Sequence, residues 1–263
     1  MGLMWLPGLA MVLISVAGLI TALFLPPLKP GDKSIEYEWN PLGTYIGAFK
    51  EMAGTPLLTV MFAWSYFYFL AGLALLVIPE YTIVLKADEV TRFEASMLLG
   101  VMGVAIGLGC GICGLVSGHS IRPRMVPFGG LALAIFFLLL GFAPATLPNL
   151  GPYYRVLFSP ISFFILGAGI SAGFYIVPLQ ALMQKLTPAN ELGRFLGTAN
   201  GFSFAFLTLS ALLYKVIRPR FVSADGTEHP EKIFLVCSAF MVLGLIFILW
   251  RIKAKGFSLS KVE

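Results

Sequence analysis

Residues 159–214 decide the fold, and they read SPISFFILGAGISAGFYIVPLQALMQKLTPANELGRFLGTANGFSFAFLTLSALLY. They form two long apolar runs joined by a polar turn at 184–191. About 20 consecutive apolar residues are enough for a helix that crosses a bilayer. The runs also contain amides, tyrosine and a proline, which hydrocarbon tolerates only where another helix or a polar cavity covers them. The stretch therefore predicts a membrane hairpin that lines a polar space.

The composition of the whole chain is that of a polytopic membrane protein. Of its 263 residues, 58% are hydrophobic and 12% are charged, whereas about 25% are charged in an ordinary soluble domain. The mean hydropathy is +0.89, and no polar stretch is long enough for a separate soluble enzyme domain. The net charge of +5 is spread over the loops and forms no basic stripe, so we expect no nucleic-acid partner.

Seven apolar runs predict an all-α fold, a polytopic membrane helix bundle with seven transmembrane helices. The first run lacks the basic region and the cleavage site of a signal peptide, so we interpret it as a true span. The longest polar connection, 28–55, contains a predicted amphipathic helix at 41–52 that lies on the membrane surface. The predicted spans are residues 3–24, 56–78, 95–116, 125–142, 159–183, 193–213 and 233–250.

The distribution of lysine and arginine predicts how the chain is oriented. Seven spans place the two termini on opposite sides of the membrane. With the C-terminus inside, the inside segments carry eleven of the 18 Lys and Arg residues and the outside segments carry seven. Because cytoplasmic loops carry an excess of these residues, we expect the C-terminus in the cytoplasm and the N-terminus outside.

Glycines form a stripe along the predicted third span. Their spacing averages about 3.6 residues, which places them on one face of a helix. A stripe of small residues lets a second helix backbone come close. We therefore predict a helix–helix interface there, with Gly103, Gly107, Gly111 and Gly114 as its candidate residues. The full stripe consists of Gly100, Gly103, Gly107, Gly111, Gly114 and Gly118.

The predicted second span contains the aromatic run WSYFYF at 64–69. Trp64 and Tyr68 lie four residues apart and therefore share a helix face. Two interpretations remain open at this point. The rings either pack the helix against its neighbours, or they line a cavity for an amphipathic ligand.

No combination of residues points to catalysis, so we do not expect an enzyme. Cys110 and Cys113 have CxxC spacing, but they lie in an apolar run without polar neighbours, which indicates buried small residues rather than a redox pair. His119 and His229 lie in predicted loops. No carboxylate pair lies within a span, and no nucleophile elbow surrounds a serine. We therefore expect no catalytic residue, no metal and no cofactor.

The hairpin of residues 159–214 resembles part of a known transporter family. Residues 173–184, GFYIVPLQALMQ, with Pro188, Glu191 and the pair Gly193-Arg194, resemble the tenth-to-eleventh-helix segment of the major facilitator superfamily. The likeness is closest to the lysophospholipid transporter branch, which also occurs fused to acyl-acyl-carrier-protein synthetase and acylglycerophosphoethanolamine acyltransferase domains. It covers roughly residues 40–250 and includes SYFYFLA at 65–71, GLVSG at 114–118 and VPFG at 126–129.

The resemblance implies the second half of a twelve-helix transporter, helices six to twelve. Residues 1–27 are then the sixth helix, 28–55 the cytoplasmic linker, 56–255 the second six-helix half, and 256–263 a cytoplasmic tail. Such a half needs a partner, which we expect to be the missing N-terminal half or a second copy of the chain. We expect the protein in a bacterial cytoplasmic (inner) membrane, in contact with membrane lipid.

The chain departs from the family pattern in one loop. The superfamily motif places an acidic residue four positions after a glycine and basic residues after that. Here Gly114 is followed at that spacing by Gly118, while Arg122 and Arg124 keep the basic part. Because the carboxylate is missing, we interpret these two arginines, together with Arg194, as candidates that bind lipid headgroups or stabilise helix ends.

By the resemblance, the second and fifth spans face a ligand cavity between the two halves, whereas the third and sixth face the other half. Gln180 and Gln184 share a helix face, and we expect them to approach Asn200 across the hairpin. These amides either pair the helices or bind a substrate headgroup. The substrate-binding candidates are Trp64, Tyr66, Tyr68, Tyr175, Gln180 and Gln184. Further candidates for the helix interface or for gating are Pro178, Gly197 and Asn200.

These observations predict a transporter, or half of one, that moves an amphipathic solute by alternating access. The predicted spans contain no Asp, Glu, Lys or Arg at mid-depth. Such an uncharged, aromatic cavity suits a lysophospholipid better than a sugar or an ion. The alternative is a membrane domain that anchors or feeds a phospholipid acyltransferase or acyl-carrier-protein synthetase partner.

Overall fold

The computed structural model describes residues 5–25, 40–85, 92–118, 120–144, 146–151 and 154–254. The predicted linker residues 28–39, the tail at 256–263 and His119 lie outside this part of the chain. The described residues are helical, apart from loops and one isolated β-bridge between Val222 and Glu228. They fall into two compact units, Met1–Asn40 and Pro41–Glu263, which are considered separately.

The described residues of the first unit form one helix, α1 (Leu6–Leu23). Its side chains from Gly8 to Leu25 are all exposed, and most of them are apolar. A proline in the first turn suits a helix start, where no intrahelical hydrogen bond is lost. A helix that is apolar on every face and uncovered in its own unit is typical of a membrane span.

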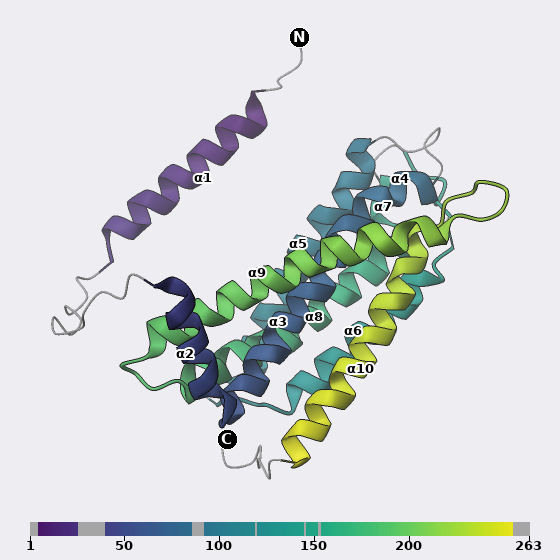
Figure 1. Cartoon of the computed structure of the whole chain (residues 1–263). Helices are drawn as coiled ribbons and strands as arrows, with labels where there is room; N and C mark the ends of the chain where they lie inside the picture. The colour runs from purple at the N-terminus through teal and green to yellow at the C-terminus, as the bar shows by residue number, and fades with distance from the viewer. Residues whose placement is uncertain are drawn as a thin grey trace. The chain divides into compact units, whose positions relative to one another are not determined.

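The second unit is a bundle of long helices joined by short ones (Figure 1). This confirms the predicted all-α fold, and each helix that matches a predicted span does so to within a few residues. Among the described residues, five helices are long and apolar enough to cross a membrane, while α1 and α6 are shorter apolar helices. The long helices are α2 (Pro41–Ala53), α3 (Pro56–Val77), α5 (Arg92–Ser117), α6 (Met125–Gly141), α8 (Pro160–Leu186), α9 (Leu192–Ile217) and α10 (Ile233–Ala254). The short ones are η1 (Ile78–Glu80), α4 (Tyr81–Val84), α7 (Tyr154–Leu157), η2 (Arg218–Phe221) and η3 (Pro230–Lys232).

Local sequence explains where the helices begin and end. Ser159 caps α8, because its hydroxyl oxygen accepts a hydrogen bond from the backbone N–H of Ser162 at 3.4 Å, and Pro160 follows at the first helical position. Gly118 ends α5 with a φ of +59°, a conformation that glycine adopts without a steric penalty. Pro178 lies inside α8, which nevertheless continues through it to Leu186.

The bundle has two ends, which are named here after the short helices beside them. The α2 end contains α2, the starts of α3, α6 and α9, and the last turns of α5, α8 and α10. The α4 end contains the short helices η1, α4, α7, η2 and η3. Helices α3 and α8 pack against each other at the centre, with α9 on α3, with α5 and α6 on α8, and with α10 on both α6 and α3.

Helix α2 lies against the bundle rather than apart from it. Ala48 and Met52 are fully buried against the bundle. Phe49 contacts Phe62 of α3 and Phe202 of α9, with ring centroids 6.1 and 5.8 Å apart. The linker residues 41–55 therefore form a fixed part of this unit.

Candidate functional site

The aromatic side chains of α3 point in two different directions. Trp64 is buried, and its ring lies 5.5 Å from that of Tyr68, as expected for residues on one helix face. Tyr66 points elsewhere, because its hydroxyl donates a hydrogen bond of 2.6 Å to the carbonyl of Phe240 on α10. Tyr66 also packs on Gly244, where any larger residue would overlap with its ring. Of Trp64, Tyr66 and Tyr68, it is therefore Tyr66 that contributes to the contact between α3 and α10.

Tyr175 of α8 completes an aromatic cluster with α3. It is fully buried, and its hydroxyl donates a hydrogen bond of 3.1 Å to the carbonyl of Ala63. Phe67 links Tyr175 to Tyr68, with ring centroids 6.0 and 5.9 Å away. We call Trp64, Phe67, Tyr68 and Tyr175 the aromatic cluster.

One polar atom of the aromatic cluster is not satisfied. The indole Nε1 of Trp64 is buried and has no hydrogen-bond partner among the described residues. A buried N–H without a partner costs about 1–3 kcal/mol, and such groups are uncommon in native structures. Trp64 therefore presents a donor that a bound ligand would satisfy.

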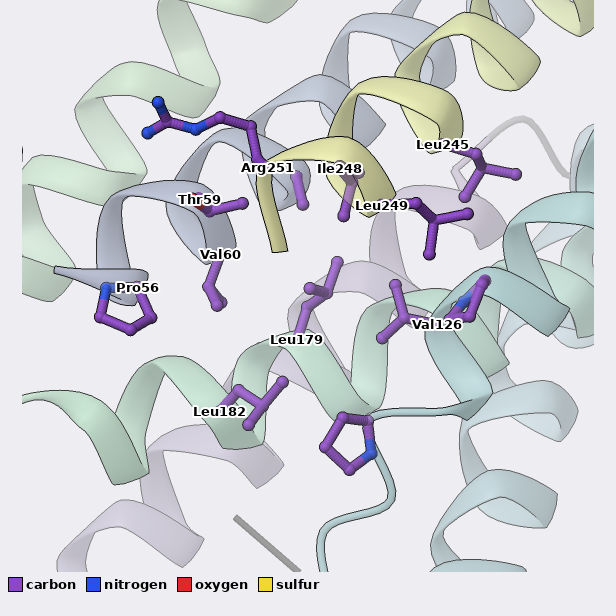
Figure 2. A pocket seen from close by; sticks show the side chains of 13 residues that line it. Pro56, Thr59, Val60, Val126, Leu179, Leu182, Leu245, Ile248, Leu249 and Arg251 are labelled. Carbon is purple, nitrogen blue, oxygen red and sulfur yellow. The ribbon is translucent and has the colours of Figure 1, made fainter. Parts of the chain in front are cut away.

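Apolar cavities lie on both sides of the aromatic cluster. Towards the α4 end, a cavity of about 240 Å³ is lined only by apolar surface from α3, α5, α6, α8 and α10, and Phe67 forms part of its wall. Towards the α2 end, a narrow cavity of about 50 Å³ lies between α3, α6, α8 and α10, and Ala63 forms part of its wall (Figure 2). The cluster therefore separates two apolar spaces inside one bundle.

The cavity at the α2 end has one charged residue at its edge. Figure 2 shows Leu179, Leu182 and Val126 facing Val60 and Ile248 across the space, while the guanidinium of Arg251 extends away from these side chains. The free volume of this cavity is well below the roughly 300–1,000 Å³ of a pocket that encloses a drug-sized ligand. In this conformation the cavity is a narrow apolar slot.

The predicted amides are not part of the aromatic cluster. Gln180, Gln184 and Asn200 are exposed, and none of them forms a hydrogen bond within the part of the chain that the structure describes. The expectation that they meet across the hairpin is therefore not met in this bundle. The reason is geometric, since α8 and α9 contact each other only slightly and α9 packs mainly on α3.

The predicted glycine stripe lies on an open face of α5. A Cβ added at Gly103, Gly107, Gly111 or Gly114 would meet no other atom of the described residues within 4 Å. Gly197 of α9 is equally open, and it is exposed like Asn200. The role of these residues at an interface stays a prediction.

Helix α5 packs closely against α8 through other glycines. A Cβ on Gly173 would overlap with the backbone of Gly109 and Cys110, and a Cβ on Gly109 would overlap with the backbone of Ile170. Small residues thus serve two opposite faces of α5. The regular spacing of the glycines in the sequence predicts only the open face of α5 and not the face that contacts α8.

The gating candidate Pro178 is buried next to Leu179, which lines the cavity at the α2 end. Proline has no N–H, so the carbonyl of Phe174 loses its usual partner within the helix. At this level α6 approaches closely, because a Cβ on Gly129 would lie 2.7 Å from the backbone nitrogen of Tyr175. The weak point of α8 thus lies beside both the cavity and the aromatic cluster.

The arginine candidates have different surroundings. Arg194 binds two carboxylates, through Nη1 to Glu51 of α2 at 3.1 Å and through Nε to Glu191 at 2.7 Å. It therefore connects α2 to the start of α9. Arg122 and Arg124 are exposed and line a shallow depression with Phe128 and Phe174.

The sequence interpretation missed two ion-pair clusters at the α4 end. Glu94 at the start of α5 is 1% exposed and accepts a hydrogen bond from Nε of Arg155 at 3.0 Å. Arg218 binds Glu80 at 2.7 Å and Glu228 at 2.8 Å. Charged residues directly next to apolar runs were the available signal, but the partners lie up to 138 positions apart and no spacing rule connects them.

The two ends differ in charge. Seven cations and two carboxylates lie at the α2 end, against six cations and five carboxylates at the α4 end, counted over the described residues. Both carboxylates at the α2 end are bound to Arg194. The cations there are Lys50, Arg122, Arg124, Lys185, Arg194, Arg251 and Lys253. The described part of the chain contains no group of three or more His, Cys, Asp and Glu residues that could hold a metal ion.

Comparison with known families gives one match. The family model described as Major Facilitator Superfamily matches residues 2–211 of the chain. No solved structure matches the chain.

Proposed function

Because the chain belongs to the major facilitator superfamily and is an integral membrane transporter protein, we propose that it moves an amphipathic lipid, specifically a lysophospholipid, by alternating access. The observation that carries the substrate class is the aromatic cluster between two apolar cavities. A single acyl chain matches the apolar walls, and the unpartnered Nε1 of Trp64 would donate to an oxygen of the glycerol or ester group.

The distribution of charge supports the same substrate class. Within the described spans, acidic and basic side chains lie near the ends of the bundle and not at mid-depth. Such a path is costly for an ion but not for an acyl chain. We further propose a bacterial cytoplasmic membrane with the more basic α2 end, and therefore the C-terminus, on the cytoplasmic side.

The complete transporter requires a second set of helices. The family fold consists of two halves, and the open faces of α5 and α9 in this bundle carry glycines that are not covered by any described residue. We infer that these faces pack against the other half of the transporter, whether it belongs to the same polypeptide or to a second chain.

Two conservative substitutions on α3 test the site. Trp64→Phe removes the unpartnered donor and keeps an aromatic ring, so uptake of lysophosphatidylethanolamine into liposomes by the full assembly falls about tenfold while the unfolding free energy does not fall. Tyr66→Phe is the matched control, because it removes the hydrogen bond to Phe240 and costs about 1 kcal/mol of stability without changing uptake.

Two outcomes of this experiment would contradict the proposal. Equal uptake by wild-type protein and Trp64→Phe excludes the indole donor from the substrate site. Uptake of a small hydrophilic solute, with no uptake of the lysophospholipid, excludes the lipid substrate altogether.

A further inference from the structure

A groove lies between α2 and α9, outside the bundle interior. Its free volume is about 510 Å³. Ile46 and Phe49 of α2 form one wall, and Phe202 of α9 forms the other. Tyr45 crosses the groove at Gly201, where a Cβ would lie 3.0 Å from the tyrosine ring. The groove is therefore apolar and is bounded by aromatic rings.

The rim of the groove carries a cation without a partner. Lys50 lines the groove and forms no hydrogen bond or ion pair with any described residue. The two nearby carboxylates, Glu51 and Glu191, are both bound to Arg194. A negatively charged group that enters the groove thus meets Lys50 without competition from an internal carboxylate.

Helix α2 also has a second apolar face that no part of the unit covers. Leu42 is 71% exposed and Ile46 is 56% exposed, one helical turn apart, whereas Ala48 and Met52 are buried against the bundle. A short helix with an apolar exposed face and a lysine at its edge lies in the interface between water and lipid. We therefore expect the groove to open at the depth where phospholipid headgroups begin.

We propose that the groove between α2 and α9 binds one phospholipid with a net negative headgroup from the surrounding leaflet. Its acyl chain lies against Phe49 and Phe202, and its phosphate pairs with Lys50. The excess of cations over carboxylates at the α2 end favours an anionic lipid over a zwitterionic one. The bound lipid contacts both α2 and α9, so the lipid composition of the leaflet influences how firmly these helices stay together. This site is separate from the proposed transport path and does not depend on its substrate.

The test uses native mass spectrometry of the full chain with two probes that share the same acyl chains, phosphatidylglycerol and phosphatidylcholine. The wild-type protein retains one phosphatidylglycerol molecule more tightly than phosphatidylcholine. Lys50→Gln weakens phosphatidylglycerol binding about fivefold, which corresponds to the loss of one lysine near a charged leaflet. Lys50→Arg keeps the charge and retains binding. Lys215→Gln, at an exposed lysine of the α4 end, is the matched control and has no effect.

A second pair of variants separates the groove from general attachment of α2 to the surface. Ile46→Asp places a carboxylate in the groove wall and abolishes retention of the lipid, whereas Leu42→Asp on the same exposed face, outside the groove, does not. Equal retention of both lipids, no effect of Lys50→Gln, or equal effects of Ile46→Asp and Leu42→Asp would each overturn the proposal.

A photo-cross-linker identifies the occupant directly. With benzoylphenylalanine in place of Ile46, cross-linking in native membranes yields a product that is heavier by one phospholipid. A cross-link to another segment of this chain, or to a second copy, shows instead that protein fills the groove and contradicts the proposal.

Discussion

Helices α3 and α8 differ from α5 and α9 in how they are fixed. In the apolar part of α3 67% of the residues are buried, and in α8 50%, against 17% in α5 and 22% in α9. The central pair is stabilised along its length by apolar packing and by hydrogen bonds such as that from Tyr175 to Ala63. Helices α5 and α9 pack on one face only.

The two poorly covered helices are fixed at their ends by charge. Glu94 and Arg155 fix the start of α5, while Arg194 fixes the start of α9. Arg218, directly after α9, binds Glu80 and Glu228. Because an ion pair at one point leaves the rest of the helix face open, this arrangement keeps long surfaces of α5 and α9 available for other helices.

The largest effect is expected where α5 meets α8. Gly173→Leu places a side chain where even a Cβ overlaps with the backbone of Gly109, so the two helices must separate. We expect a loss of about 3 kcal/mol or more of unfolding free energy, at or beyond the upper end for overpacked cores. Denaturation in mixed micelles measures this loss of unfolding free energy. Gly111→Leu, on the open face of α5, is the control, and an equal loss there would remove the distinction between the two faces.

A somewhat smaller effect is expected at the buried charge pair. Arg155→Met removes the guanidinium that binds the carboxylate of Glu94, which is 1% exposed. Removing one partner of a buried pair typically costs about 3–5 kcal/mol, and since Arg155 is partly exposed we expect about 3 kcal/mol.

The same denaturation assay tests this pair, and Glu94→Gln in the Arg155→Met background recovers part of the loss because it removes the buried charge. Arg220→Met, at an exposed arginine of the same end, is the control. If Arg155→Met is as stable as Arg220→Met, the start of α5 is fixed by packing and not by charge.

Sequence reasoning was accurate for the helices themselves. The length and position of the apolar runs predicted where the helices lie from local information alone. The same local information predicted a helix at 41–52, where α2 runs from Pro41 to Ala53.

The pairing of helices was less accessible to sequence reasoning. A glycine period reveals a face but not the neighbour that covers it, so the stripe of α5 was apparent while the contact through Gly109 was not. Likewise, Glu94 and Arg155 are 61 positions apart, and nothing local in the sequence joins them. The aromatic run predicted Trp64 beside Tyr68, but the opposite direction of Tyr66 depends on α10, which only the folded bundle specifies.

The smallest effect on the bundle, and the most informative one, is expected at the open stripe of α5. A Cβ at Gly107 would meet no described atom of the bundle within 4 Å, and leucine is a better helix former than glycine. The unfolding free energy of the isolated chain therefore stays unchanged or rises by up to about 1 kcal/mol. If the stripe is covered by helices of the other half, the added side chain blocks their close approach. Transport by the full assembly then falls by more than tenfold.

Helix α10, whose exposed surface is apolar, provides a contrast to the open face of α5. Helix α10 exposes large apolar residues, including Leu243, Ile246 and Phe247, as a surface in contact with lipid does. Helix α5 exposes Val104 and Leu108 as well, but beside them it exposes Gly103, Gly107 and Gly111, and such a row of small residues lets a second helix backbone come closer than lipid chains do. Val242→Leu on α10 adds a methylene group at a lipid-facing position and should change neither stability nor transport. If Gly107→Leu is equally silent in both measurements, the stripe faces lipid, and the difference between the central and the poorly covered helices reflects their position in the bundle and not an interface.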